Sequence, residues 1–408
     1  MGEVNTHRYQ VLPWLVFSFT TILVLISLVP VVFPALFSET FFETDAERIG
    51  VSTHFELEPF ELGVLAIPLI VTNIGVLIFF IFLWKKQLWR KIDLLLQFEI
   101  GNKIIPIIII IIGIYAAATF SEIGFGQHHS LIDEEYVDWE RLKNRIINMQ
   151  DIWPDQITAE PHFKHTLLKI SQILFGNFFV VPYVSSIGLL IVTYLFTTKI
   201  SKSRTAGLIS LLIVLQSNLF LTFDTSPSYA SFWILLFVLS LYMMIRSWPL
   251  SPIFYILSLF SKLSVIAYAP MSIFFVLNSN ITKQKKIIVA ALTLLIFAAT
   301  ISIATTQNFS QTEWEWNEFW IGFTAFAFQM RLDSLIILFL LPLVIGLFII
   351  SKRNRYALSI LVMIGCILLI APITTGLSNE TNQPYRFLSL VVFFAVGVGL
   401  LFSKIQTK

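Results

Sequence analysis

A short acidic stretch at residues 131–141 (LIDEEYVDWER) holds the side chains with the clearest capacity for chemistry. It places three consecutive carboxylates, Asp133, Glu134 and Glu135, shortly after an apolar run. A carboxylate held near a membrane surface can act as a general base that takes the proton of an attacking hydroxyl group. Asp133 is the first candidate for this base and Glu134 the second. The helix dipole also favours acidic residues at the start of a helix, so the stretch alone leaves both interpretations open.

Three cations could stabilise negative charge on a departing phosphate. Lys262 lies inside an apolar stretch, Arg386 opens the last apolar run, and Arg331 precedes an earlier run. Tyr385, next to Arg386, is a further candidate for contact with the substrate or its phosphate. A charged side chain at such a position is costly in lipid, so ligand binding is the first hypothesis for it. Snorkelling of Lys262 and interfacial anchoring by Arg386 are the structural alternatives.

Five further residues could contact a sugar or its acceptor. Trp314 and Trp316 could stack on a sugar ring, although Trp is equally common in the interfacial belt of membrane proteins. His162 and His165 stand in a long loop, where histidines are usually only solvated. Asp224 lies between two apolar runs and could line a cavity or have no role.

The histidines and the cysteine form no metal-binding pattern. His128, His129, His162 and His165 have no spacing such as His-Glu-x-x-His. The single cysteine, Cys366, lies in an apolar run and can form no internal disulfide. The sequence therefore gives no support for a divalent metal, and we expect no cofactor to be required.

The composition predicts a membrane protein. Of 408 residues, 56% are hydrophobic and 13% charged, against roughly 25% charged residues in soluble domains. The apolar residues form runs of about 18–25, enough to cross the hydrocarbon core of a bilayer. Strict alternation of a barrel strand is absent, so the spans are expected to be α-helices. Basic residues occur in short clusters between runs, which argues against nucleic-acid binding.

The runs predict about twelve helices of near-spanning length. The stretch 250–279 is too long for one span and predicts two shorter helices. The first run follows no basic n-region and precedes no cleavage site, so we expect it to be retained. Besides the two helices of 250–279, the predicted spans are 12–37, 62–84, 103–120, 178–198, 206–222, 229–246, 286–305, 332–350, 357–376 and 387–403.

Basic residues fall in alternate loops, which predicts the orientation by the positive-inside rule. We expect a multi-pass protein of the cell membrane with both termini cytoplasmic and the acidic loops outside. The outer loop 121–175 repeats apolar residues at steps of three and four between charges. This spacing predicts an amphipathic helix at about 134–149, and a second at about 163–174, lying in the membrane interface.

From residue 133 onward the chain resembles the GT-C fold glycosyltransferases that use polyprenyl-phosphate sugars. This group includes the protein O-mannosyltransferases and the aminoarabinose transferases of lipid A. The acidic stretch is similar to the family's first outer motif, an acid followed by an aromatic-rich interfacial helix. The other stretches that carry the resemblance are residues 167–176 (LLKISQILFG), 184–207, 257–270 (LSLFSKLSVIAYAP) and 383–388 (QPYRFL).

The resemblance covers roughly residues 102–403 and has two departures. The family's His-Pro-Pro or Pro-Pro-Leu motif is replaced here by residues 160–165 (EPHFKH), which puts the positioning of donor or acceptor in doubt. The spans before residue 102 have no counterpart in its short members. We therefore expect residues 1–101 to form an accessory pair of helices and residues 102–408 a GT-C-like catalytic bundle.

The resemblance implies an inverting membrane glycosyltransferase. Its donor would be a sugar on polyprenyl (dolichyl) phosphate, and its acceptor a lipid, glycan or protein on the outer or luminal face. Membrane lipids would be its other partners. A transporter would show paired hydropathy repeats, and a non-catalytic assembly subunit would need no acidic motif, but both remain alternatives.

Overall fold

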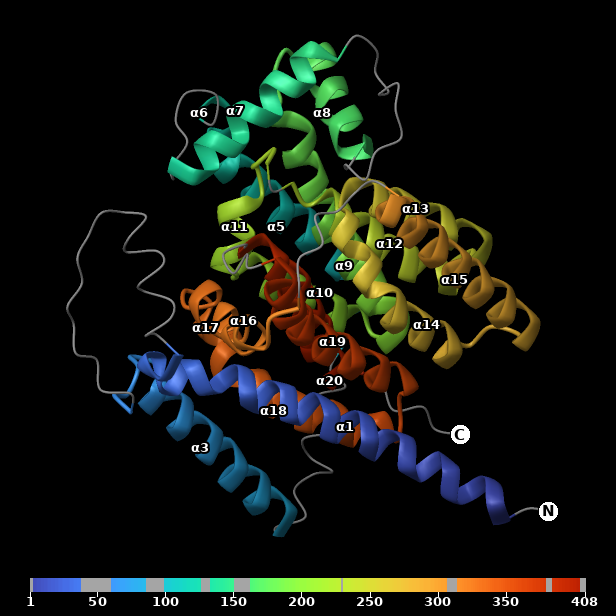
Figure 1. The fold of residues 1–408 in the computed structure, drawn as a ribbon. Helices are drawn as coiled ribbons and strands as arrows, with labels where there is room; N and C mark the ends of the chain where they lie inside the picture. Colours follow the sequence, from blue (N-terminus) through green and yellow to red (C-terminus); the bar gives the residue numbers. More distant parts are fainter. Residues whose placement is uncertain are drawn as a thin grey trace. The chain divides into compact units, whose positions relative to one another are not determined.

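The computed structural model describes residues 3–37, 60–85, 99–125, 133–149, 162–228, 230–306, 314–378 and 384–403. Within these ranges the regular elements are all helices, and there is no strand (Figure 1). The predicted all-helical class is therefore confirmed. The physical reason is that helices satisfy every backbone hydrogen bond within one segment, as apolar surroundings demand.

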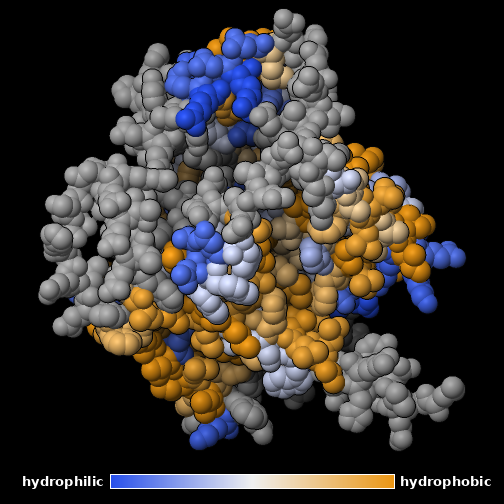
Figure 2. Space-filling model, in the orientation of Figure 1, coloured by the Kyte–Doolittle hydropathy of each residue, from blue (hydrophilic) through white to orange (hydrophobic). Residues whose placement is uncertain are grey.

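Four helices are long and apolar enough to cross a membrane, as expected of a membrane protein. Shorter apolar helices of 10–17 residues accompany them. Figure 2 shows that apolar side chains also cover much of the visible helical surface, where a soluble protein would present polar ones. The four long segments are Val11–Val32, Val180–Ser201, Ser334–Ser351 and Arg355–Leu377.

The chain divides into two compact units. We call Met1–Phe98 with Gln311–Lys408 the terminal unit, and Glu99–Ser310 the central unit. The apolar helices Glu3–Val32 and Ala66–Lys85 thus pack with the last part of the chain. The expectation that residues 1–101 are accessory and residues 102–408 catalytic concerns function rather than packing, and it stays a prediction.

The terminal unit is built from long helices joined by short ones. α1 packs on α17, α18 and α19, α3 packs on α18, and α20 packs on α18 and α19. Side-chain hydrogen bonds link some of these helices: Thr20 Oγ1 donates to the Leu361 carbonyl at 3.0 Å, and Asn73 Nδ2 to the Leu338 carbonyl at 3.3 Å. Its elements are α1 (Glu3–Val32), η1 (Pro34–Phe37), α3 (Ala66–Lys85), α16 (Trp316–Ile321), α17 (Thr324–Gln329), α18 (Ser334–Ser351), α19 (Arg355–Ser378), η5 (Pro384–Phe387) and α20 (Leu388–Leu401).

The central unit has shorter and more often interrupted helices. The predicted break in the 250–279 stretch falls at Lys262, between α13 and η4. The predicted single span 206–222 is wrong, because α10 ends at Leu215 and Ser217 then caps the N-terminus of α11 by accepting from the Phe220 amide. The elements are η2 (Gly101–Lys103), α5 (Ile104–Thr119), α6 (Glu122–Phe125), α7 (Asp133–Asn148), α8 (His162–Phe175), α9 (Val180–Ser201), α10 (Arg204–Leu215), α11 (Asn218–Phe223), α12 (Phe232–Arg246), η3 (Trp248–Leu250), α13 (Ser251–Ser261), η4 (Leu263–Tyr268), α14 (Ala269–Asn278) and α15 (Lys283–Thr306).

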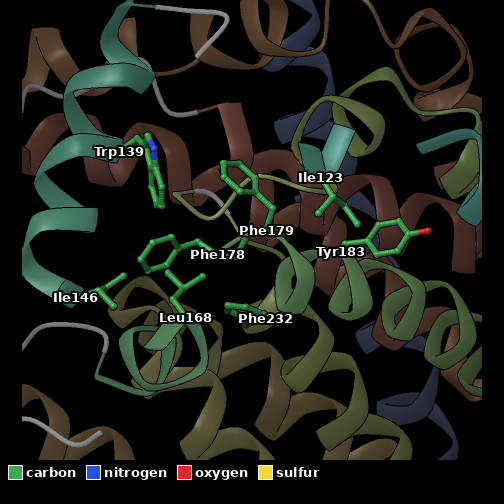
Figure 3. Close-up of a cluster of buried hydrophobic side chains, with 9 residues drawn as sticks. Ile123, Trp139, Ile146, Leu168, Phe178, Phe179, Tyr183 and Phe232 are labelled. Carbon is green, nitrogen blue, oxygen red and sulfur yellow. The ribbon is translucent and has the colours of Figure 1, made fainter. Parts of the chain in front are cut away.

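The two amphipathic helices form where the spacing predicts them, as α7 and α8. The Trp139 ring on α7 meets the rings of Phe178 and Phe179 with centroid distances of 5.4 and 5.5 Å (Figure 3). Lys169 on α8 donates to the carbonyls of Ile146 and Met149, which closes the C-terminus of α7. An apolar face and a C-terminal cap therefore fix α7 to the rest of the central unit.

Candidate functional site

The best-formed polar site of the central unit surrounds Asp224, in the loop between α11 and α12. Its side chain is only 2% exposed. The Tyr115 hydroxyl on α5 donates to Asp224 Oδ2 at 2.6 Å. Asp224 Oδ1 is also buried, and no group in the described ranges forms a hydrogen bond with it. One carboxyl oxygen is thus fixed and the other is left to accept from a ligand.

Three serines hold this loop in place. Ser186 on α9 donates to the Asp224 carbonyl at 2.6 Å. Because a hydroxyl has one hydrogen, the Ser231 hydroxyl must donate in its contact of 3.0 Å with Ser186, and Ser185 must donate to Ser231 at 3.1 Å. Both ends of the loop are therefore fastened to α9, which fixes the backbone that carries the Asp224 carboxyl.

The surroundings adjust the acidity of Asp224. Burial raises its pKa to about 7, the hydrogen bond from Tyr115 opposes the shift, and the charge of Glu122 adds to it. Burial also raises the pKa of Glu122 on α6, against the effect of its contact with Thr225. A carboxyl with a pKa near 7 can take up and release a proton at neutral pH, which is what general acid–base chemistry needs.

Lys262 and Trp233 form a second polar pair in the same unit. The Lys262 ammonium nitrogen is buried and lies 5.1 Å from the centroid of the Trp233 ring. Ser258 on α13 donates to the Trp233 carbonyl at 2.6 Å, which ties α13 to the start of α12. Trp233 follows Ser231 by two residues, so the loop that carries Asp224 leads directly into this pair.

The histidines of α8 differ from the sequence-based expectation. His162 and His165 lie on a helix and are 3% and 4% exposed, so they are not solvated loop residues. Burial is the main cause, with the charges of Lys164 and Arg145, of the lowering of the pKa of His165 to about 4. His165 is therefore neutral at physiological pH. Lys164 donates to the Ser228 carbonyl, which links α8 to the loop that carries Asp224.

The predicted bases Asp133 and Glu134 begin α7, but their side chains lie outside the described residues. Their catalytic roles stay predictions. His128 and His129 also lie outside the described residues. Among the residues that are described, no three His, Cys, Asp or Glu side chains gather as metal ligands would.

The remaining predicted residues belong to the terminal unit. Arg386 donates through Nη1 to Thr374 Oγ1 on α19 at 2.7 Å. The Glu315 amide donates to the carbonyl of Gly376, two residues along the same helix from Thr374, at 3.1 Å. The end of α19 thus brings Arg386 and the start of α16 to one place. The side chain of Tyr385 lies outside the described residues.

An aromatic cluster begins at the same place. Trp314 lies 5.3 Å from Trp316 and 5.4 Å from Phe319, measured between ring centroids. Trp316 is 65% exposed, so a ring face is open to lipid or to a ligand. Arg331 instead lies over the exposed Phe328 ring at 4.3 Å from the centroid, which is the contact of a surface cation rather than of a formed anion site.

Comparisons with protein-family models, curated proteins and solved structures match nothing to this chain. The site must therefore be interpreted from its own residues. Sequence reasoning gave Asp224 little weight and did not select Tyr115, Glu122 or Trp233. One signal was available, because Asp224 is the only acidic residue between residues 161 and 312. No local pattern marks Tyr115, which lies 109 residues from its partner.

Proposed function

We propose that this chain is a GT-C-like membrane glycosyltransferase of about twelve helices. It would transfer a sugar from polyprenyl phosphate to an acceptor on the outer or luminal face of the cell membrane. The observation that carries the proposal is the buried Asp224 carboxyl, with Oδ2 held by Tyr115 and Oδ1 available to a ligand. The resemblance of residues 131–141 and 257–270 to the family supports the same reaction class.

In this proposal a carboxylate takes the hydroxyl proton of the acceptor. The acceptor oxygen then bonds to the anomeric carbon of the sugar, and the bond from that carbon to the phosphate oxygen breaks. The electron pair leaves with the lipid phosphate, whose growing charge requires fixed donors. Asp224 suits the base because its pKa lies near 7, and Asp133 and Glu134 are the sequence-based candidates. Lys262, in the same unit as Asp224, is a candidate phosphate-binding cation, and Arg386 stays a separate candidate that the sequence suggests.

The test uses membranes that contain the full chain and labelled polyprenyl-phosphate sugars. We expect Asp224→Asn to reduce transfer by a factor of about 10²–10⁴, the usual contribution of a general base. Asp133→Asn and Glu134→Gln are measured beside it. The matched control is Glu140→Gln, which removes a carboxylate of α7 that is about one third exposed and pairs with Lys143. Full activity in all three candidate variants would remove the proposed base. A chelator should leave transfer unchanged, since no metal is expected to be required.

The proposed orientation has a separate test. With Cys366 replaced by Ala, a cysteine introduced at Tyr136 should react with an impermeant reagent from outside the cell. Labelling only from the cytoplasmic side would overturn the proposed topology.

A proton-coupled transporter is the second candidate. It is favoured by the same buried carboxyl, because a carboxyl with a pKa near 7 among apolar helices can carry a proton. Reconstituted vesicles distinguish the two functions. Proton uptake that Asp224→Asn abolishes, without any sugar transfer, would favour the transporter.

A further inference from the structure

The indole nitrogen of Trp233 is a buried donor at the start of α12. Its side chain is 3% exposed, and its Nε1–H finds no acceptor among the described residues. A donor that has lost its hydration without gaining an acceptor is unfavourable, so such groups in folded proteins usually meet a ligand or a water molecule. Trp233 is therefore a position at which a bound acceptor would be stabilising.

A positive charge lies over the ring that carries this donor. Lys262 Nζ is buried 5.1 Å from the Trp233 ring centroid. The Lys262 amide donates to the carbonyls of Ser258 and Leu259, and the Ser258 hydroxyl donates to the Trp233 carbonyl. These bonds fix the backbone at Lys262, between α13 and η4, relative to the start of α12 that carries the indole. Two donors, one of them charged, select an anion with several oxygens rather than a neutral acceptor.

A second Lys–Trp pair in the same unit shows what is unusual here. Lys285 Nζ lies 6.0 Å from the centroid of Trp248, which follows the other end of α12. Trp248 is only half-buried, so its indole N–H does not have the same need for a protein or ligand acceptor. A cation over an indole ring is thus not enough to mark a ligand site, and the buried donor makes the difference.

We propose that Trp233 and Lys262 together bind the phosphate head of a polyprenyl phosphate, an inference that rests on the proposed function for the choice of lipid. Phosphate offers several acceptor oxygens, so that one can face the indole N–H and another the ammonium. Exposed apolar side chains on the neighbouring helices, such as Ile253 on α13 and Leu277 on α14, are compatible with lipid around this part of the unit. Trp233 would be a donor to the phosphate in addition to the cation already proposed.

The experiment measures binding by the purified full chain in detergent. The probes are undecaprenyl phosphate, the neutral undecaprenol and inorganic phosphate, each followed by the shift in thermal unfolding. Trp233→Phe keeps a ring beneath the ammonium but removes the N–H, and Lys262→Met keeps most of the side-chain volume but removes the charge. We expect each to weaken the binding of undecaprenyl phosphate about ten- to a hundredfold, the effect of losing a hydrogen bond to a charged group. Trp248→Phe and Lys285→Met are the matched controls and should bind as the wild type does.

The outcomes separate the alternatives. Wild-type affinity in Trp233→Phe would overturn the role of the indole, and equal binding of undecaprenol would overturn phosphate recognition. An equally strong shift with inorganic phosphate would support the phosphate site but overturn the lipid as its source. If Trp233→Phe does not fold, Lys262→Met still tests the site with the indole in place. Phosphate-dependent binding without sugar transfer would leave this inference standing while the proposed function fails.

Discussion

The two units use similar apolar segments in different ways. Among the described residues, three of the four helices long and apolar enough to cross a membrane, α1, α18 and α19, belong to the terminal unit, whereas the fourth, α9, belongs to the central unit. Most of the buried polar and charged side chains in the described ranges belong to the central unit, including Asp224, His162 and His165. The continuous helices of the terminal unit mainly bury apolar side chains. In the central unit, the helix ends at each interruption leave backbone and side-chain polar groups that form hydrogen bonds with one another.

This difference explains where chemistry can occur. An uninterrupted helix satisfies its own backbone groups and offers a ligand few donors or acceptors. The breaks at Ser217, at the loop of Asp224 and at Lys262 instead bring side-chain and backbone polar groups together inside the bundle. The central unit therefore has shorter, interrupted helices and more buried polar groups than the terminal unit. The following predictions test that contrast.

The largest expected effect is a pH dependence confined to the central unit. The raised pKa of Asp224 means that the folded state holds a proton more tightly than the unfolded state, so this group reduces stability as pH rises from about 4 to 7. The full effect is ~4 kcal/mol for a shift of about three pKa units. The lowered pKa of His165 acts in the opposite sense, because stability is lost as pH falls from about 6.5 to 4.

The two groups should nearly cancel in the wild type, so single variants reveal them. His165→Gln should become more stable as pH falls from 7 to 4, and Asp224→Asn should become less stable over the range from 6.5 to 4. Thermal unfolding at several pH values measures both. If stability changes with pH in the same way in the wild type and in both variants, the burial of Asp224 and His165 does not contribute to the pH dependence of stability.

The next effect concerns packing in the terminal unit. Phe393 on α20 is fully buried, so Phe393→Ala should cost on the order of 3 kcal/mol through the cavity that it leaves. This loss should not depend on pH. Cys366, the only cysteine, lies on α19 in the same unit, so its rate of reaction with a thiol reagent reports the opening of that unit. A Cys366 reaction rate unchanged from the wild type would contradict the expected cost.

A smaller effect is expected at the contact between Tyr115 and Asp224. Tyr115→Phe removes the hydrogen bond that stabilises the ionised carboxyl, so the pKa of Asp224 should rise further. The expected loss of stability at pH 8 is about 1–3 kcal/mol, and the acidic limb of any transfer activity, which reports deprotonation of the base, should move to higher pH. Tyr183→Phe, which removes a bond to a carbonyl instead, is the matched control and should leave the pH profile in place.

The smallest effect is expected on the surface of α7. Lys143 and Glu140 form an i,i+3 ion pair at 3.3 Å, and both side chains are about one third exposed. Glu140→Gln should change stability by less than about 0.5 kcal/mol, since solvent and salt screen such pairs. A larger loss in a thermal unfolding series would show that α7 depends on this ion pair more than on the packing of Trp139.

Local sequence information predicted most of the helices but less of the candidate site. The spacing of apolar residues placed α7 and α8 almost to the residue, and the length of the 250–279 stretch predicted a break there. The break after α10 was missed, because its cause is a single serine cap at Ser217 inside an otherwise apolar run. Lys262 and Asp224 could be selected because each is an isolated charge among apolar residues.

The sequence by itself predicted a membrane environment and the all-helical class, because hydrophobic content and the length of apolar runs depend on residue types alone. Only the tertiary structure decided that the first helices pack with the last ones. It also decided that Tyr115 meets Asp224, and that the Trp233 indole is buried beside Lys262. These features depend on directional contacts between residues far apart in the chain. Periodicity along a single helix carries no information about such partners.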